Sequence, residues 1–487
     1  MRQHITIGFD ADAPGRSTID ISIEHALRHT LVMGKSGSGK SFLVASLLCQ
    51  LLTPPRSSCV TVLDYKGETI GILLRLLQVL GDSAPINPSD ILSFSLANDA
   101  CLKLDPLLPV PGLHPATQSA MVVSLMSQLS NPFGPRMENI ARALVHCAIL
   151  AGATLLDVRA LLIDDRLAPV LAARVPDAEL QTYLLHVYEN EPTASKESLR
   201  SRLDMLLALP TARAMLTCGA CTPVELFLES PLALLDLGGA GLGGKAAAGF
   251  IGGWIFTLVA ASIYARTPGP QLLHSTVVID EWQRLLGGTG AADDLEDILA
   301  TARSNKVSLV LCNQYAAQIS AVSPALWEGV KANVALEVLF RPDSADVRHV
   351  DRSLPVTGCA IDPARPDRLL SPAVERDRLH TQLANLPPRH ALFINHLQSS
   401  PGSIIRTPTL PITEAAAAWD ALGTTEQVAW HRGGFAVPSA SLVPRRTLTT
   451  PAAAPARSAT VESVTDTRDE AETAPGRSRR PRLRILP

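Results

Sequence analysis

Residues 34–41 read Gly34-Lys35-Ser36-Gly37-Ser38-Gly39-Lys40-Ser41, which is the pattern G-x-x-x-x-G-K-S. An apolar run at 31–33 precedes this stretch and another at 42–48 follows it, so the order predicts a strand, a glycine-rich loop and a helix. Such a loop directs backbone N–H groups and a helix N-terminus at nucleotide phosphates. Lys40 is expected to reach the β- and γ-phosphates, and Ser41 to offer its hydroxyl to Mg²⁺. The alternative is a serine–glycine loop that matches by chance.

Length and composition indicate a soluble protein with more than one folding unit. The chain has 487 residues, of which 46% are hydrophobic and 18% charged, and its formal net charge is −3. Any affinity for nucleic acid must therefore come from local patches. The eight cysteines are scattered, several of them inside apolar runs, which is typical of reduced thiols in the cytoplasm. Cys218 and Cys221 form a lone C-x-x-C without a second pair at zinc spacing.

One segment has the length and composition of a membrane span. Residues 246–265 are uncharged, and Gly249 and Gly253 lie at G-x-x-x-G spacing. The segment lies between the glycine-rich loop and an acidic strand described below, so a membrane crossing would separate two halves of one nucleotide site. We therefore expect a buried core helix and no intrinsic membrane span. The first twenty residues alternate apolar and polar side chains, which predicts a strand and no signal peptide.

The remaining pattern predicts an α/β core with one helical insertion. Strand-like runs at 59–64, 232–237, 275–280, 307–313 and 334–340 are mostly followed by helical patterns, which predicts a parallel central sheet with helices on both faces. The predicted units are an N-terminal part of the core at 1–109, an all-α insertion at 110–228 and a C-terminal part of the core at 229–415. A terminal helix at 416–435 and a disordered tail at 436–487, rich in Pro, Ala and Arg, complete the chain.

Two carboxylates lie at the end of the strand-like run at 275–280. Asp280 ends the run and Glu281 comes next. Opposite a phosphate loop, Asp280 can hold Mg²⁺ through water, and Glu281 can act as general base for the attacking water. The alternative is an acidic helix cap after a buried strand.

Two further residues belong to the candidate site. Gln314 follows the strand at 307–313, at the end where ligands bind in open α/β sheets, and can sense the γ-phosphate through a water. Arg303 precedes the same strand and can reach a neighbouring subunit's site to stabilise phosphoryl charge. The alternative for Arg303 is a solvated helix residue.

A second glycine-rich stretch at 239–246 also satisfies G-x-x-x-x-G-K. Its next residue is Ala246, which has no hydroxyl for Mg²⁺, and no second acidic strand is free to complete another site. We interpret it as a flexible loop between a strand and a helix, with its role left open.

Taken together, these residues resemble the FtsK/HerA superfamily of hexameric motors, and within it the conjugative coupling proteins (TraG/TraD-like) and the ATPases of type IV secretion. The resemblance covers roughly residues 25 to 415. It rests on the phosphate loop, on the carboxylates after the strand at 275–280, on Gln314 and on Arg303 eleven residues before it. Further matches are Asp64-Tyr65-Lys66-Gly67-Glu68, similar to the D-x-K-G-E of coupling proteins, the helical insertion, and residues 386–392, which look like the closing strand.

The resemblance implies a RecA-like P-loop core that uses ATP and Mg²⁺ and forms a homo-hexamer, in which Arg303 acts in trans. It also implies DNA as the partner, with unknown strandedness, in conjugative transfer or type IV secretion. The resemblance further implies that the protein is cytoplasmic, with peripheral attachment at the inner membrane as a second expectation. Secretion or DNA-processing partners would then be recruited by the tail. Coupling proteins usually begin with transmembrane helices and HerA proteins with a small β-barrel, and the short segment before the loop fits neither. An ATPase motor for protein secretion or assembly, and a nucleotide-gated adaptor, remain the alternatives.

Overall fold

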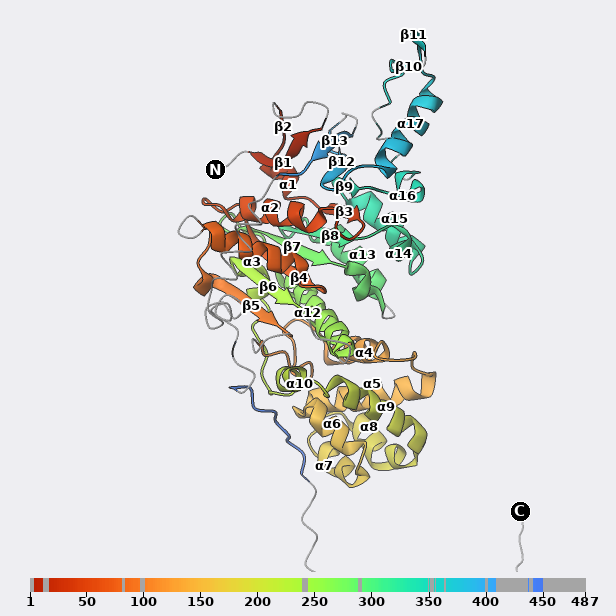
Figure 1. Ribbon diagram of the computed structural model, residues 1–487. Coiled ribbons are helices and arrows are strands. Elements are labelled where there is room, and N and C mark those ends of the chain that lie inside the picture. The colour runs from red at the N-terminus through yellow and green to blue at the C-terminus, as the bar shows by residue number, and fades with distance from the viewer. Residues whose placement is uncertain are drawn as a thin grey trace, which may run out of the picture. The chain divides into compact units, whose positions relative to one another are not determined.

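The computed structural model describes residues 4–11, 17–80, 84–96, 101–238, 244–287, 291–348, 350, 354, 356–362, 365–398, 402–408, 437 and 441–449. These residues build an eleven-stranded sheet with the order β2-β1-β13-β12-β9-β3-β8-β7-β4-β6-β5 (Figure 1). Residues 416–435, the predicted terminal helix, lie outside the described residues, as do residues 450–487 of the predicted tail.

Seven neighbouring strands of the sheet, from β9 to β5, are parallel, which confirms the predicted fold class. Every residue of β3 is buried, as expected for a strand covered on both faces. The parallel strands are β3 (Thr30–Gly34), β4 (Ser58–Asp64), β5 (Ile91–Ser95), β6 (Leu232–Asp236), β7 (His274–Asp280), β8 (Val307–Asn313) and β9 (Leu336–Phe340).

An antiparallel extension continues the sheet beyond β9. It contains the first and last strands of the core, so β1 pairs with β13 although the two are far apart in sequence. Its strands are β1 (His4–Asp10), β2 (Thr18–Ser22), β12 (His390–Asn395) and β13 (Ser403–Arg406), and a separate two-stranded hairpin consists of β10 (Ile361–Asp362) and β11 (Arg365–Leu369).

Side chains that alternate along the strands supply two hydrophobic cores. In β3, Leu31 and Met33 belong to one core and Val32 to the other, because successive side chains of a strand point to opposite faces. The helices outside the insertion are α1 (Ile23–Ala26), α2 (Lys40–Leu52), α3 (Glu68–Leu80), η2 (Pro88–Asp90), α12 (Lys245–Ala265), η6 (Trp282–Gly287), α13 (Ala291–Thr301), α14 (Ala317–Ser320), α15 (Pro324–Asn333), α16 (Ser344–Arg348) and α17 (Pro372–Ala384). Of these, α2 and α3 contribute to the same core as Val32.

The segment between β5 and β6 forms a helical region that begins with α4 (Figure 1). Its helices share the core that contains Leu31, so the region packs on the sheet domain and does not form a separate core. They are α4 (Pro115–Ser127), α5 (Pro135–Ala151), α6 (Leu155–Leu161), η3 (Asp165–Leu167), α7 (Ala168–Ala172), α8 (Ala178–Thr182), η4 (Tyr183–Val187), η5 (Tyr188–Asn190), α9 (Thr193–Leu206), α10 (Pro210–Leu216) and α11 (Leu226–Glu229).

Helix α12 contains the apolar segment discussed above. Among the described helices it is the one long and apolar enough to cross a membrane by length and composition, and 72% of its most apolar window is buried in the protein. It packs against α4, α9 and α11. Two glycines permit this close packing: an added Cβ would lie 2.3 Å from Tyr65 Oη at Gly252 and 2.3 Å from Leu125 at Gly253. The segment is therefore a buried core helix.

A short segment of the predicted tail, residues 441–449, lies against the helical region, and we call it the strap. The backbone N–H groups of Thr447 and Leu448 each donate to Asp157 Oδ1 at 2.8 Å, and Arg445 N donates to Thr217 O at 2.7 Å. The Asp157 and Leu448 side chains are fully buried. The strap thus differs from the expected disorder because it satisfies a buried carboxylate and buries a leucine.

Truncation after residue 436 should destabilise the protein, whereas truncation after residue 449 should not. Loss of the strap exposes the apolar surface that Leu448 covers and removes hydrogen-bond donors from buried Asp157. Together these losses should lower the free energy of unfolding by about 2 to 5 kcal/mol. The urea midpoint of unfolding should fall in the shorter protein only. Equal midpoints for the two truncated proteins would contradict this role of the strap. The truncation after residue 449 also leaves every candidate site residue in place, because all of them lie upstream.

Candidate active site

The phosphate loop connects β3 to α2 at the carboxyl edge of the sheet. Two of its glycines are required by the backbone. An added Cβ at Gly34 would lie 2.5 Å from the Cβ of Phe340 in β9. Gly39 has a φ of +113°, a backbone conformation that residues other than glycine rarely adopt. The loop is therefore held tightly against the neighbouring strand, with α2 beginning at Lys40.

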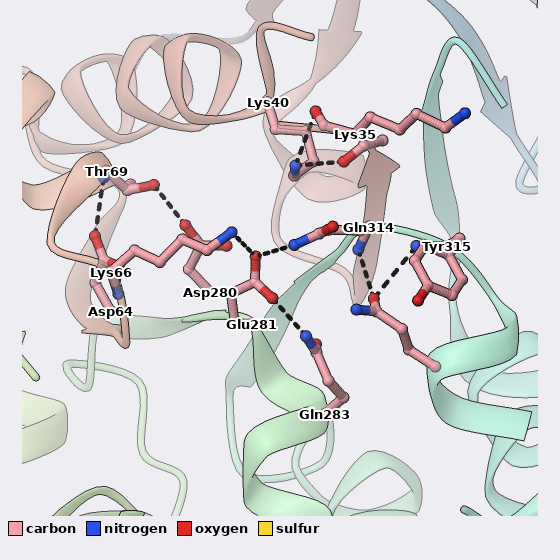
Figure 2. A network of polar contacts seen from close by, with 12 residues as sticks. Lys35, Lys40, Asp64, Lys66, Thr69, Asp280, Glu281, Gln283, Gln314 and Tyr315 are labelled. Atoms are coloured by element: carbon pink, nitrogen blue, oxygen red, sulfur yellow. Dashed lines mark hydrogen bonds and ion pairs between the residues drawn. The ribbon is translucent and has the colours of Figure 1, made fainter. Parts of the chain in front are cut away.

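Lys40 and Ser41 are both buried at the start of α2, each with 8% of its surface exposed. Lys40 Nζ donates to Gly34 O and, at 3.5 Å, to Lys35 O (Figure 2). The ammonium group thus lies inside the curve of the loop, where the phosphates of a nucleotide would be held.

Asp280 lies at the end of β7, beside the end of β4. Thr69 Oγ1 donates to Asp280 Oδ2 at 3.0 Å. Asp64, at the end of β4, accepts four backbone N–H groups, from Lys66, Gly67, Thr69 and Ile70, and so caps the start of α3. Burial, followed by the nearby Asp64 carboxylate, raises the pKa of Asp280 to about 6.

Glu281 is held by three side chains (Figure 2). Lys66 Nζ forms an ion pair with Glu281 Oε1, Gln314 Nε2 donates to the same oxygen at 3.0 Å, and Gln283 Nε2 donates to Oε2. Burial favours the neutral acid, but the hydrogen bonds from Lys66 and Gln314 outweigh it and hold the pKa of Glu281 below its usual value. The carboxylate is therefore ionised at neutral pH. The backbone of Glu281 has a φ of +58°, which turns the chain directly after β7.

One cavity of about 230 Å³ brings most of the predicted site together. The two carboxylates, Asp280 and Glu281, face the phosphate loop across it. The predicted residues that line the cavity are Lys35, Ser36, Gly37, Gly39, Lys40, Ser41, Asp280 and Glu281. Gln314 reaches this group through its hydrogen bond to Glu281.

Arg303 lies away from this cavity. It is exposed in the turn that precedes β8, whereas the phosphate loop follows the carboxyl end of the parallel neighbour β3. Since β8 spans seven residues, Arg303 and the loop of its own chain are separated by about 20 Å along the strands. Arg303 therefore cannot contact a nucleotide bound to the phosphate loop of the same chain.

The structure adds two cationic residues to the site. Lys66 belongs to the D-x-K-G-E stretch, and its contact with Glu281 joins residues 215 positions apart. Arg389, just before β12, lines the cavity from the other side. The backbone N–H of Arg389 donates to Ser38 O at 2.8 Å. Burial lowers the pKa of the Arg389 guanidinium. In the sequence, the only sign of a site role for Arg389 is its position in the stretch at 386–392 that resembles the closing strand.

Asp280 is the expected Mg²⁺ ligand, and in that role it should hold Mg²⁺ less well as the pH falls below about 6. The pKa of Asp280 is raised in the folded protein, so its carboxylate becomes protonated below that value, and a protonated carboxyl group is a poor ligand for Mg²⁺. The apparent Mg²⁺ affinity of the nucleotide complex should fall by about tenfold per pH unit below the pKa. Calorimetric titration with Mg²⁺ at several pH values from 7 to 5 measures this affinity. Asp280→Asn is the control: its weaker affinity should show only the decline that comes from the nucleotide's own terminal phosphate, which also becomes protonated at about pH 6. An equal decline in both proteins would assign the titration to a group other than Asp280.

Residues 7–92 match the family model of the HerA helicase central domain. No curated protein matches the sequence. Among solved structures, VirB4 of Thermoanaerobacter pseudethanolicus is similar at 15% identity with a TM-score of 0.52, covering 85% of this chain and 99% of that chain. The chain has the fold of FtsK/HerA-type ATPases.

Two structures of the plasmid coupling protein TrwB support the same fold. An unbound bacterial conjugative coupling protein TrwB, named TrwBdeltaN70, has 15% identity and a TM-score of 0.50, covering 80% of this chain and 87% of that chain. TrwB in complex with the non-hydrolysable GTP analogue GDPNP has 15% identity and a TM-score of 0.50, covering 84% and 90%. The FtsK/HerA resemblance expected from the sequence is thus confirmed at the level of the fold.

Proposed function

We propose that this protein is an ATP-dependent DNA translocase that works as a hexameric ring and serves conjugative DNA transfer or type IV secretion. The observation that carries the proposal is the single cavity in which the phosphate loop faces Asp280 and Glu281. A motor ATPase needs these groups together, because one binds phosphates, one holds the metal and one accepts a proton. The fold shared with a conjugative coupling protein supports the choice of process.

The donor groups of the cavity fit a nucleoside triphosphate with Mg²⁺. Ser41 and Asp280 offer hydroxyl and carboxylate oxygens, the hard ligands that Mg²⁺ prefers, and Lys40 offers a buried cation for the phosphates. When bound, Mg²⁺ would neutralise charge that develops on the transferred phosphoryl group. The complex of TrwB with GDPNP is consistent with a triphosphate at such a loop.

Glu281 is the proposed general base, and Lys66 regulates its strength. While the Lys66 ammonium is paired with Oε1, the carboxylate is ionised but only weakly basic. Movement of Lys66 away from Glu281 would raise the pKa of the carboxylate towards the range that favours proton transfer from water. Gln314 holds the same oxygen and so couples the end of β8 to the base.

Arg303 is proposed to act on the neighbouring subunit's nucleotide. The position of Arg303 near the opposite end of the strands excludes its own site, and its side chain is exposed. A ring with head-to-tail contacts presents such a residue to the next subunit. There the guanidinium would stabilise charge in the transition state.

ATP hydrolysis should be measured with and without single- and double-stranded DNA, alongside native mass in the presence of ATP. We expect stimulation by DNA and a mass of six subunits. A ring whose rate of ATP hydrolysis is unchanged by either DNA form would favour a motor for protein secretion or assembly. Binding of ATP without hydrolysis would favour a nucleotide-gated adaptor. Recovery in the cytoplasmic fraction or at the inner membrane, released by salt, would fit the proposed location.

A further inference from the structure

Arg303 belongs to a turn, residues 302–306, that joins α13 to β8, and we call it the arginine turn. The first residue that anchors this turn is Asn305. Its Nδ2 donates to Ile263 O, in the last turn of α12, at 2.9 Å, and the two residues are 42 positions apart. Ile263 is fully buried, so the bond ties an exposed turn to the hydrophobic core.

The second anchoring residue is Lys306, at the end of the arginine turn. Lys306 Nζ donates to Gly269 O at 2.7 Å and to Leu272 O at 3.1 Å, both in the connection between α12 and β7. The backbone carbonyl of Lys306 accepts from Ser275 N, in β7, at 2.9 Å. Its φ of +55° is a conformation that a residue with a side chain keeps only where its surroundings impose it. Lys306 is therefore fixed both at its backbone and at the end of its side chain.

Arg303 contrasts with these two neighbours. Its side chain is exposed, and among the residues that the structure describes its guanidinium forms no hydrogen bond or ion pair. The arginine turn thus presents an unpaired cation on a fixed backbone. A solvated surface arginine does not need such a backbone. A group that stabilises a transition state does, because it must lie in a defined place.

The anchors also connect the arginine turn to the candidate site of its own chain. The hydrogen bond between Lys306 and Ser275 lies near the start of β7, and the same strand ends at Asp280, directly before Glu281. Strand β7 is paired with β4 on one side and with β8 on the other. The turn and the two carboxylates therefore belong to one rigid sheet, so a subunit that changes its orientation in a ring carries Arg303 with it.

We propose that Asn305 and Lys306 are positioning residues for ATP hydrolysis in the neighbouring subunit, because they hold the arginine turn so that Arg303 meets the neighbour's nucleotide at a fixed place. The inference rests on the proposed function, in which Arg303 acts in trans. The side chains of Asn305 and Lys306 point back into their own chain, so they act only through Arg303. A displacement of about 1 Å of such a group can lower a rate by about 10²-fold.

The test measures what one subunit contributes to the next. Rings are assembled from equal amounts of two subunits: Arg303→Ala, which keeps an intact phosphate loop, and Lys40→Ala, which keeps an intact Arg303. In these parent rings, only an interface that joins the loop of the first subunit to the arginine of the second can hydrolyse ATP. Any further substitution in the Lys40→Ala subunit then reports on the presentation of its arginine, because its own nucleotide site is already inactive.

Three substitutions are added singly to the subunit that supplies the arginine. Asn305→Asp keeps the size of the side chain but removes its N–H donor, so it cannot bond to a backbone carbonyl. Lys306→Met keeps the apolar part of the side chain and removes the ammonium group. Ser304→Ala is the matched control, because Ser304 Oγ donates to Thr301 O, at 2.7 Å, and its loss leaves both anchors in place.

The kcat of the mixed rings should fall by up to about 10²-fold with Asn305→Asp and with Lys306→Met. The KM for ATP should not change, because ATP binds to the loop of the other subunit. Lys306→Arg, which keeps a cationic donor, should restore most of the rate. Ser304→Ala should leave kcat and KM at the values of the parent rings, and native mass verifies that every mixture forms rings.

The outcomes separate this inference from the proposed function. Active parent rings whose kcat is unaffected by Asn305→Asp and Lys306→Met would overturn the positioning roles and leave the trans role of Arg303 intact. Parent rings shown to be mixed but inactive would overturn both. A fall in kcat that accompanies loss of the mixed rings, or an equal fall with Ser304→Ala, would assign the two residues to folding or assembly and overturn the inference.

Discussion

Glu281→Gln should bind ATP with Mg²⁺ almost as well as the wild-type protein and hydrolyse it about 10²- to 10⁴-fold more slowly. The amide keeps the size of the side chain, and its oxygen can still accept from Lys66 and Gln314, which contact Glu281 Oε1. It cannot accept a proton from water. Single-turnover hydrolysis, beside fluorescent-nucleotide binding, separates the chemical step from affinity.

Lys40→Ala is the matched comparison, because it should lose affinity and turnover together. Lys40 is the buried cation inside the loop, so its removal affects ground-state binding as well as the transition state. Both variants should unfold at similar urea concentrations. Near-normal turnover by Glu281→Gln would remove that residue from the mechanism and direct attention to Asp280.

Arg303→Ala should bind ATP and form rings but hydrolyse ATP up to about 10³- to 10⁵-fold more slowly, because the missing charge is needed only in the transition state. The exposed side chain should also make the substitution harmless to folding. Multiple-turnover hydrolysis at saturating ATP, with native mass to verify the rings, measures the loss.

Mixing Arg303→Ala with Lys40→Ala subunits tests whether Arg303 acts in trans. In an equal mixture, about a quarter of the head-to-tail interfaces would join an intact phosphate loop to an intact Arg303. Hydrolysis should therefore return to a fraction of the wild-type rate. Rings shown to be mixed that remain inactive would contradict the trans role.

The parts of the fold and site that sequence predicts are those encoded locally. Gly34 to Ser41 lies between apolar runs and forms the expected strand, loop and helix, and the carboxylates follow β7 as expected. Each depends on residues within a few positions of one another. The strand order then brings the two groups into one cavity, because carboxyl ends of parallel strands share an edge.

The residues that sequence does not reveal are placed by long-range packing. Lys66 meets Glu281 only because β4 and β7 are neighbours, and Arg389 reaches the loop because the antiparallel extension folds back beside β9. The strap has a composition typical of disorder, and its order depends on Asp157 nearly 300 residues earlier. No local pattern contains that information.

Helix α12 has a consequence for the order of synthesis. The ribosome makes the chain from its N-terminus, so α4, α9 and α11 are complete before residues 245–265 emerge. These three helices are packing partners of α12, and Tyr65 and Leu125, which meet its glycines, are also made earlier. An apolar segment of membrane-spanning length therefore finds three of its packing partners already synthesised, which shortens the time in which a targeting factor or a lipid surface can capture the nascent chain.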